Sequence, residues 1–117
     1  MIDNKEEAVI YLDCTVEQAL NYAVANIDLL DGFHVNKIDE SGIILFEKKR
    51  TSFFSLTFGE RLRAEFKSVA GNKTKVYISS VSKLGTELAA RRDNRRNVQT
   101  IADFMFKEFP AYIYFDC

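Results

Sequence analysis

The sequence predicts an α+β domain, in which one antiparallel sheet of five or six strands is covered on one face by two helices. Two stretches have apolar residues at helical spacing, at residues 15–30 and at about 94–109. Between them, apolar residues alternate with a period of two, which is typical of strands with one buried face. The expected order is therefore β-α-β-β-(β)-β-β-α, with both helices available to cover the same face of the sheet.

Length and composition are those of one soluble globular domain, which we expect to span residues 1–117 with residues 1–6 frayed. Of the 117 residues, 47% are hydrophobic and 28% are charged, as in ordinary globular proteins. No apolar run approaches the roughly 18–20 residues that a membrane-spanning helix needs. The polar, acidic N-terminal segment does not resemble a signal peptide. These features predict a cytoplasmic protein without a transmembrane segment.

The first strand and the first helix follow from local signals. Residues 8–12 carry the β-branched and aromatic side chains that favour a strand. Thr15, followed three residues later by Gln18, forms a capping-box pattern at which a helix begins. Gly32 suits the end of this helix, because glycine readily adopts the left-handed conformation of a helix cap. The apolar stripe of the helix consists of Val16, Leu20, Ala23, Val24 and Ile27.

The sheet continues with residues 33–38 and 43–49, two strands joined by a turn rich in Asp, Ser and Gly. Residues 53–58 form either a further strand or a loop, whereas residues 62–67 and 75–80 alternate between apolar and polar positions. This alternation assigns one face of the sheet to the core. The predicted inward-facing residues are Ile10, Leu12, Leu62, Ala64, Phe66, Val76 and Ile78.

The second helix is predicted from an apolar stripe near the end of the sequence. Asp93 or Asn94 is expected to cap its start, and Pro110 marks its end. The segment at residues 111–117 is rich in aromatic residues, so we expect it to pack on the domain or on a partner chain. The stripe itself consists of Val98, Ile101, Ala102, Met105 and Phe109.

This order of elements resembles the helix-grip arrangement of START-like lipid-binding domains and of a lipoprotein subunit of the bacterial outer-membrane barrel assembly machinery. Residues 32–35 (Gly-Phe-His-Val) and 39–44 (Asp-Glu-Ser-Gly-Ile-Ile) also resemble the opening of many small bacterial domains. The resemblance implies an antiparallel sheet wrapped around a long C-terminal helix. It carries no catalytic motif, so it assigns no role to any residue.

No residue pattern predicts catalysis, a metal site or a cofactor. His34 is the only histidine, and its place beside Val35 in a strand puts it on the wetter face. One histidine and two distant cysteines do not provide the ligand spacing of a zinc site, and no glycine-rich phosphate-binding loop occurs. We therefore predict a protein that is not an enzyme. The alternative is a small hydrolase-type enzyme in which His34 works with a carboxylate such as Asp39 or Glu47.

Four arginines within six residues form the sharpest local signal: Arg91, Arg92, Arg95 and Arg96. Guanidinium groups suit phosphate or carboxylate, and the expected helix start beside them adds unpaired backbone N–H groups. One hypothesis is an anion-binding site, and the other is an ordinary solvated surface. A peripheral membrane contact or a nucleic-acid contact is a further alternative. The acidic pI of about 5.8 makes nucleic acid the weaker of these two.

Large apolar side chains provide the second candidate site. A curved sheet closed over a helix can leave an apolar pocket between them. An apolar small ligand is therefore an alternative to an anionic one, and simple core packing is the alternative to both. The residues in question are Phe53, Leu56, Phe58, Phe66, Ile101 and Met105.

Charge is divided unevenly along the sequence. Residues 1–47 contain ten acidic and two basic residues, a net charge of −8, and residues 48–117 contain seven acidic and fourteen basic residues, a net charge of +7. Together with the aromatic C-terminal segment, this division is compatible with a homodimer. The division can also vanish in the folded protein, if acidic and basic elements lie side by side. The function we predict is a non-catalytic binding or interaction module for a small apolar or anionic ligand.

Overall fold

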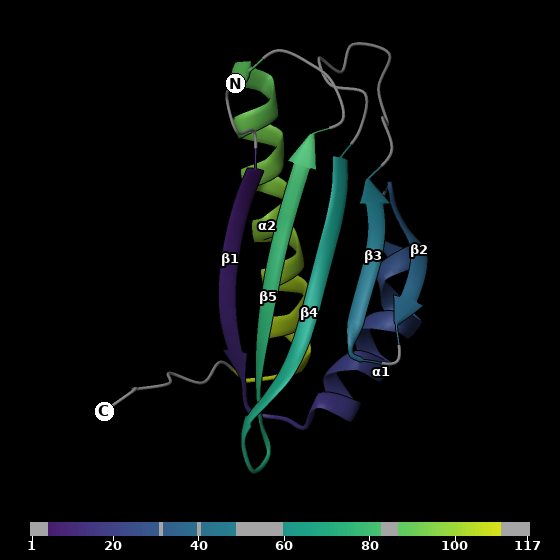
Figure 1. Ribbon diagram of the computed structural model, residues 1–117, viewed down its shortest axis with the longest axis vertical. Helices are drawn as coiled ribbons and strands as arrows, with labels where there is room; N and C mark the ends of the chain where they lie inside the picture. The colour runs from purple at the N-terminus through teal and green to yellow at the C-terminus, as the bar shows by residue number, and fades with distance from the viewer. Residues whose placement is uncertain (1–4, 31, 40, 49–59, 83–86, 111–117) are drawn as a thin grey trace, which may run out of the picture.

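The computed structural model describes residues 5–30, 32–39, 41–48, 60–82 and 87–110. Within them, one antiparallel sheet of five strands is covered on one face by two helices, which confirms the predicted fold class (Figure 1). Two parts of the prediction lie outside the described residues. These are the segment 53–58, with Phe53, Leu56 and Phe58, and the aromatic segment 111–117.

The order of the elements is the predicted one. They are β1 (Lys5–Leu12), α1 (Val16–Asn26), a short 3-10 helix η1 (Ile27–Leu29), β2 (Phe33–Asp39), β3 (Ile43–Lys48), β4 (Glu60–Ala70), β5 (Lys73–Ser82) and α2 (Glu87–Glu108). In the sheet the strands lie in the order β1-β5-β4-β3-β2. Because β1 and β2 form opposite edges, α1 and η1 carry the chain across one face of the sheet, and α2 packs beside them on β1 and β5 (Figure 1).

The strands at the β1 edge extend further than the sequence pattern indicates. β1 begins at Lys5, which lies opposite Val81 of β5. Residues 5 and 6 are therefore paired in the sheet, although we expected them to fray. The other end of β1 is also fixed, since the Asp13 backbone N–H donates to the Pro110 carbonyl at 2.9 Å. This bond ties the end of α2 to the end of β1.

α1 begins where the capping box predicts. The Thr15 hydroxyl accepts a hydrogen bond from the Gln18 backbone N–H at 3.1 Å, and the Gln18 side chain accepts one from the Thr15 backbone N–H at 3.0 Å. Two of the otherwise unpaired donors at the helix start are thereby satisfied. Past η1, Gly32 adopts a φ of 85°, which is the left-handed conformation expected of it.

α2 begins at Glu87, so the expectation that Asp93 or Asn94 caps it was wrong. Asn94 lies inside the helix and is fully buried against β5. The Ser80 hydroxyl donates to Asn94 Oδ1 at 2.8 Å, and Asn94 Nδ2 donates to the Ser82 hydroxyl at 3.1 Å. The polar side chain that suggested a cap is therefore used in a tertiary contact, which local sequence does not reveal.

The core lies between the inner face of the sheet and the two helices. All seven residues predicted to face inward are buried there, and so are Val98, Ile101, Ala102 and Met105 of the α2 stripe. The other side of the sheet is the wetter one, as the alternation predicts. On this face of the sheet, the two helices leave a space between them.

Candidate functional site

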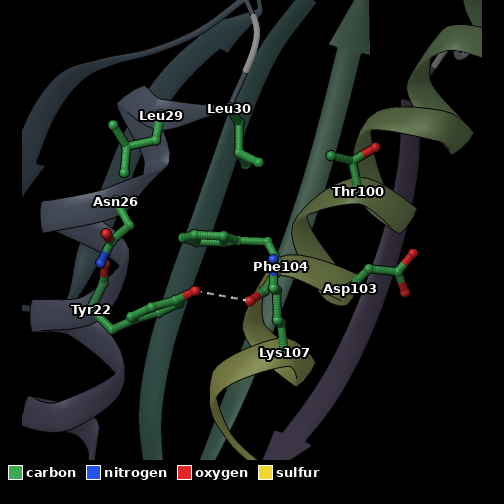
Figure 2. Close-up of a pocket in the computed structure, with 8 residues that line it drawn as sticks. All are labelled: Tyr22, Asn26, Leu29, Leu30, Thr100, Asp103, Phe104 and Lys107. Atoms are coloured by element: carbon green, nitrogen blue, oxygen red, sulfur yellow. Dashed lines mark hydrogen bonds between the residues drawn. The ribbon is translucent and has the colours of Figure 1, made fainter.

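A groove of about 490 Å³ lies between α1–η1 and α2 (Figure 2). Its volume falls in the range of about 300–1,000 Å³ that is typical of small-molecule sites. Four of the described residues line each side of the groove. They are Tyr22, Asn26, Leu29 and Leu30 on one side, and Thr100, Asp103, Phe104 and Lys107 on the other.

Two stacked aromatic rings connect the helices at the groove. The Tyr22 and Phe104 ring centroids are 4.8 Å apart with an interplanar angle of 22°, and the Tyr22 hydroxyl donates to the Phe104 carbonyl at 3.4 Å (Figure 2). Phe109 meets Tyr22 edge to face at 5.5 Å. Burial raises the pKa of the Tyr22 hydroxyl, and the Glu108 carboxylate raises it further. Tyr22 therefore remains a neutral hydrogen-bond donor with a flat apolar ring beside it.

Leu29 and Leu30 form an aliphatic wall on the η1 side. Leu29 is 79% exposed, whereas Leu30 is half-buried against the core. The wall is held in place from both ends, because Asn26 Nδ2 donates to the Tyr22 carbonyl at 2.9 Å and the Asp28 carboxylate accepts from the Val35 backbone N–H at 3.1 Å. A fixed turn thus presents a large apolar side chain to water.

The α2 side supplies a polar rim. The Thr100 hydroxyl donates to the Arg96 carbonyl at 2.8 Å, and the Asp103 carboxylate accepts from Gln99 Nε2 at 2.8 Å. Lys107 is exposed at the same rim. The groove therefore combines an aromatic floor, an aliphatic wall and a rim with hydrogen-bonding and charged groups, a mixture typical of ligand sites.

The four arginines are exposed on α2 and, with Gln99, line a second hollow of about 570 Å³. They lie within the helix rather than at its start, since α2 begins four residues before Arg91. Only the first four N–H groups of a helix lack an internal partner. The expectation that unpaired backbone N–H groups assist the arginines was therefore wrong, and an anion in this hollow would meet side chains alone.

The arginines differ in their partners. Arg92 Nε lies 3.3 Å from an Asp93 carboxylate oxygen, and Arg95 lies 3.6 Å from the Glu6 carboxylate of β1. Within the described part of the chain, the Arg96 guanidinium has no ion-pair partner. The Arg95–Glu6 pair is one place where the acidic and basic halves of the sequence meet inside a single fold.

A buried polar cluster lies further along the interface of α2 with β4 and β5, and the sequence analysis missed it. Asn97 Nδ2 donates to Glu60 Oε1 at 2.7 Å and to the Ser80 hydroxyl at 3.4 Å. Asn97 Oδ1 is buried, and no described residue donates a hydrogen bond to it. The alternation of β4 could have predicted the burial of Glu60, because Glu60 lies two residues before Leu62 and faces the same side of the sheet. The cluster lines neither the groove nor the arginine hollow.

Solved structures match this chain over most of its length, whereas no family model and no curated protein matches its sequence. A protein from Nitrosospira multiformis superposes with a TM-score of 0.62 at 14% identity, covering 90% of this chain and 95% of that one. Ara h 8.0201 superposes with a TM-score of 0.61 at 13% identity, covering 88% and 92%. This chain has the helix-grip fold. At such identities the likeness concerns the fold alone.

The helix-grip fold also occurs in a longer protein that matches. The di-domain ARO/CYC protein BexL from the BE-7585A biosynthetic pathway superposes with a TM-score of 0.59 at 10% identity, over 88% of this chain. The chain spans 44% of the length of BexL, which is less than half of that protein.

Of the apolar residues predicted to line a pocket, the three that the structure describes do not line the groove of this helix-grip domain. Phe66, Ile101 and Met105 are packed in the core, with at most 3% of each side chain exposed. The groove is instead lined by Tyr22, Leu29 and other residues. They come together only because the two helices meet at this point. No periodicity in the sequence specifies that meeting point.

His34 and the carboxylates proposed to assist it lie outside both hollows. His34 is exposed on β2, directly opposite the half-buried Glu47 of β3. Asp39 lies at the far end of β2, where a hydrogen bond from Ser41 lowers the pKa of its carboxyl. Among the residues that the structure describes, no three His, Cys, Asp or Glu side chains gather as metal ligands. In the same residues, no helix is both long and apolar enough to cross a bilayer.

Proposed function

We propose that this helix-grip chain is a non-catalytic binding module for a small apolar molecule, which lies in the groove against the Tyr22 and Phe104 rings. The observation that carries the proposal is the exposed apolar lining of a groove of about 490 Å³, in which Leu29 is 79% exposed. Exposed apolar surface of this kind marks binding sites more often than ordinary surface. The likeness to BexL, a protein of a biosynthetic pathway, adds support for a small-molecule ligand.

The groove is better suited to binding than to turnover. Among the described residues that line it, Thr100 has the one hydroxyl other than that of Tyr22, and this hydroxyl donates to a helix carbonyl. No histidine or cysteine is among those described residues. Nucleophilic catalysis needs a nucleophile within hydrogen-bond reach of a base. The hydrolase alternative requires His34, which lies on β2 and does not line the groove.

Binding of phenylnaphthylamine, a neutral aromatic dye that fluoresces in apolar surroundings, tests the proposal. We expect saturable binding to the wild-type chain. Leu29→Ser should weaken it about tenfold, since covering roughly half of a leucine side chain contributes about 1–1.5 kcal/mol. Leu29 is so exposed that this substitution should leave the fold intact.

The matched control is Val9→Ser, which removes an apolar side chain that is 44% exposed on β1. Val9 lies on the outer face of the sheet, because it alternates with the buried Ile10. This variant should bind the dye as the wild type does. Absence of saturable binding, or equal weakening in both variants, would rule out the groove as the binding site.

A further inference from the structure

We infer that the ligand of the groove is an amphipathic anion, whose carboxylate, sulfonate or phosphate group is bound by Arg96 and Arg92 while its apolar part lies in the groove. The inference rests on the proposed function and adds the chemical class of the ligand. It joins the two hollows of α2 into one extended site.

The two hollows are neighbours along α2. Gln99 lines the arginine hollow, and its side chain donates at 2.8 Å to Asp103, which lines the groove. Arg96 lies one helical turn before Thr100, whose hydroxyl bonds to the Arg96 carbonyl. One turn advances about 5.4 Å along a helix. Arg96 therefore borders the end of the groove that Thr100 lines.

Among the described residues, the positive charge on this side of the helix is only partly paired with carboxylates. Arg92 and Arg96 are four residues apart, so they are neighbours on the helix surface and repel each other. Arg92 approaches Asp93 at 3.3 Å, but within the described residues no carboxylate pairs with Arg96. An anion between the two guanidinium groups relieves the repulsion and forms charge-assisted hydrogen bonds.

The other two arginines lie on a different flank of α2. At about 100° per residue, Arg91 and Arg95 are turned away from the groove toward β1. The contact of Arg95 with Glu6 of β1 agrees with this orientation. Arg91 and Arg95 therefore provide a charge-matched control within the same hollow.

Lys107 is the competing cation. It lines the groove itself, eleven residues after Arg96, or about 16 Å further along the helix axis. We favour Arg96 because a second arginine and a hollow of about 570 Å³ accompany it. Substitution of each cation in turn separates the two positions.

Two dyes with the same aromatic framework test the inference, namely phenylnaphthylamine, which is neutral, and anilinonaphthalene sulfonate, which carries an anionic group. The measured quantity is the ratio of their dissociation constants, sulfonate over neutral, at low salt. In the Arg92→Gln/Arg96→Gln variant we expect this ratio to rise about fivefold, as the loss of two exposed ion pairs predicts, with binding of the neutral dye unchanged. In Arg91→Gln/Arg95→Gln the ratio should stay at the wild-type value.

An unchanged ratio in Arg92→Gln/Arg96→Gln overturns the inference. An equal rise in Arg91→Gln/Arg95→Gln also overturns it, because the effect would then come from net charge rather than from a site. If the ratio rises only in Lys107→Gln, the anionic group is bound at the other end of the groove, which likewise contradicts the inference. If the neutral dye binds the groove and the arginines have no effect, only this inference fails. If the neutral dye does not bind the wild type, the proposed function fails as well.

Discussion

The Tyr22 hydroxyl donates to the Phe104 carbonyl at 3.4 Å while the two rings stack with centroids 4.8 Å apart. The contact that joins α1 to α2 is thus also the floor of the candidate site. Stability and binding are therefore linked at these two residues, but they are separable at Leu29, which contributes to the wall and is largely exposed. This difference determines which substitutions report on the fold and which report on the ligand.

Truncation of the floor should destabilise the protein. Phe104 is only 8% exposed, so Phe104→Ala is expected to lower the free energy of unfolding by about 3–5 kcal/mol. Chemical denaturation measures this value. Phe106→Ala is the matched control, since Phe106 lies two residues away on the same helix and is 38% exposed. Its effect should be clearly smaller, and equal effects would show that Phe104 does not pack as described.

The Asn94 contact with β5 should stabilise the interface of α2 with the sheet. Asn94→Ala leaves the buried Ser80 hydroxyl without its acceptor, and we expect a loss of about 1–3 kcal/mol in denaturation experiments. Asn21→Ala replaces an exposed asparagine in α1 and should be neutral or slightly stabilising, because alanine is the better helix former. A neutral Asn94→Ala would contradict the buried hydrogen-bond pair.

The β2–β3 turn depends on glycine at position 42. Gly42 has a φ of 93°, and a Cβ atom there would lie 2.9 Å from the Phe66 carbonyl oxygen, whereas Gly71 has a φ of 53° and open space around it. Gly71→Ala should cost about 1 kcal/mol for the left-handed conformation alone. Gly42→Ala should cost at least about 1 kcal/mol more, because the backbone must also shift. Thermal or chemical denaturation of the two variants compares them directly.

The Cys14 thiol should be protected in the folded protein. Burial raises the pKa of this thiol; the Asp13 charge raises it further, while a side-chain hydrogen bond with Thr74 opposes the shift. An acid with a raised folded-state pKa contributes stability that is present below the unfolded pKa and is lost as the pH rises through the folded pKa. Iodoacetamide reacts with the thiolate, which burial and the raised pKa both make less available. Alkylation of a Cys117→Ser variant should therefore be slower in the native than in the unfolded state. Equal rates would contradict the buried thiol.

Period-two alternation and the capping box at Thr15 were sufficient to predict the sheet, its inward face and the first helix. These features are local, and each is determined by residues close in sequence. The start of α2 was mispredicted because Asn94 bonds to a strand rather than to the helix end. The groove could not be predicted at all, since Tyr22 and Phe104 are 82 residues apart and meet only through packing. The arginine cluster was visible in sequence, but its position relative to the groove was not.

The most direct test of the central claim is an amide NMR titration of the wild-type chain with phenylnaphthylamine. The account predicts that the largest shift changes occur at Tyr22, Leu29, Leu30 and Phe104, around the groove between the helices. Residues on the outer face of the sheet, such as Glu65 and Tyr77, should change little. Shift changes concentrated on that outer face, or saturable binding that leaves the groove residues unperturbed, would contradict the account.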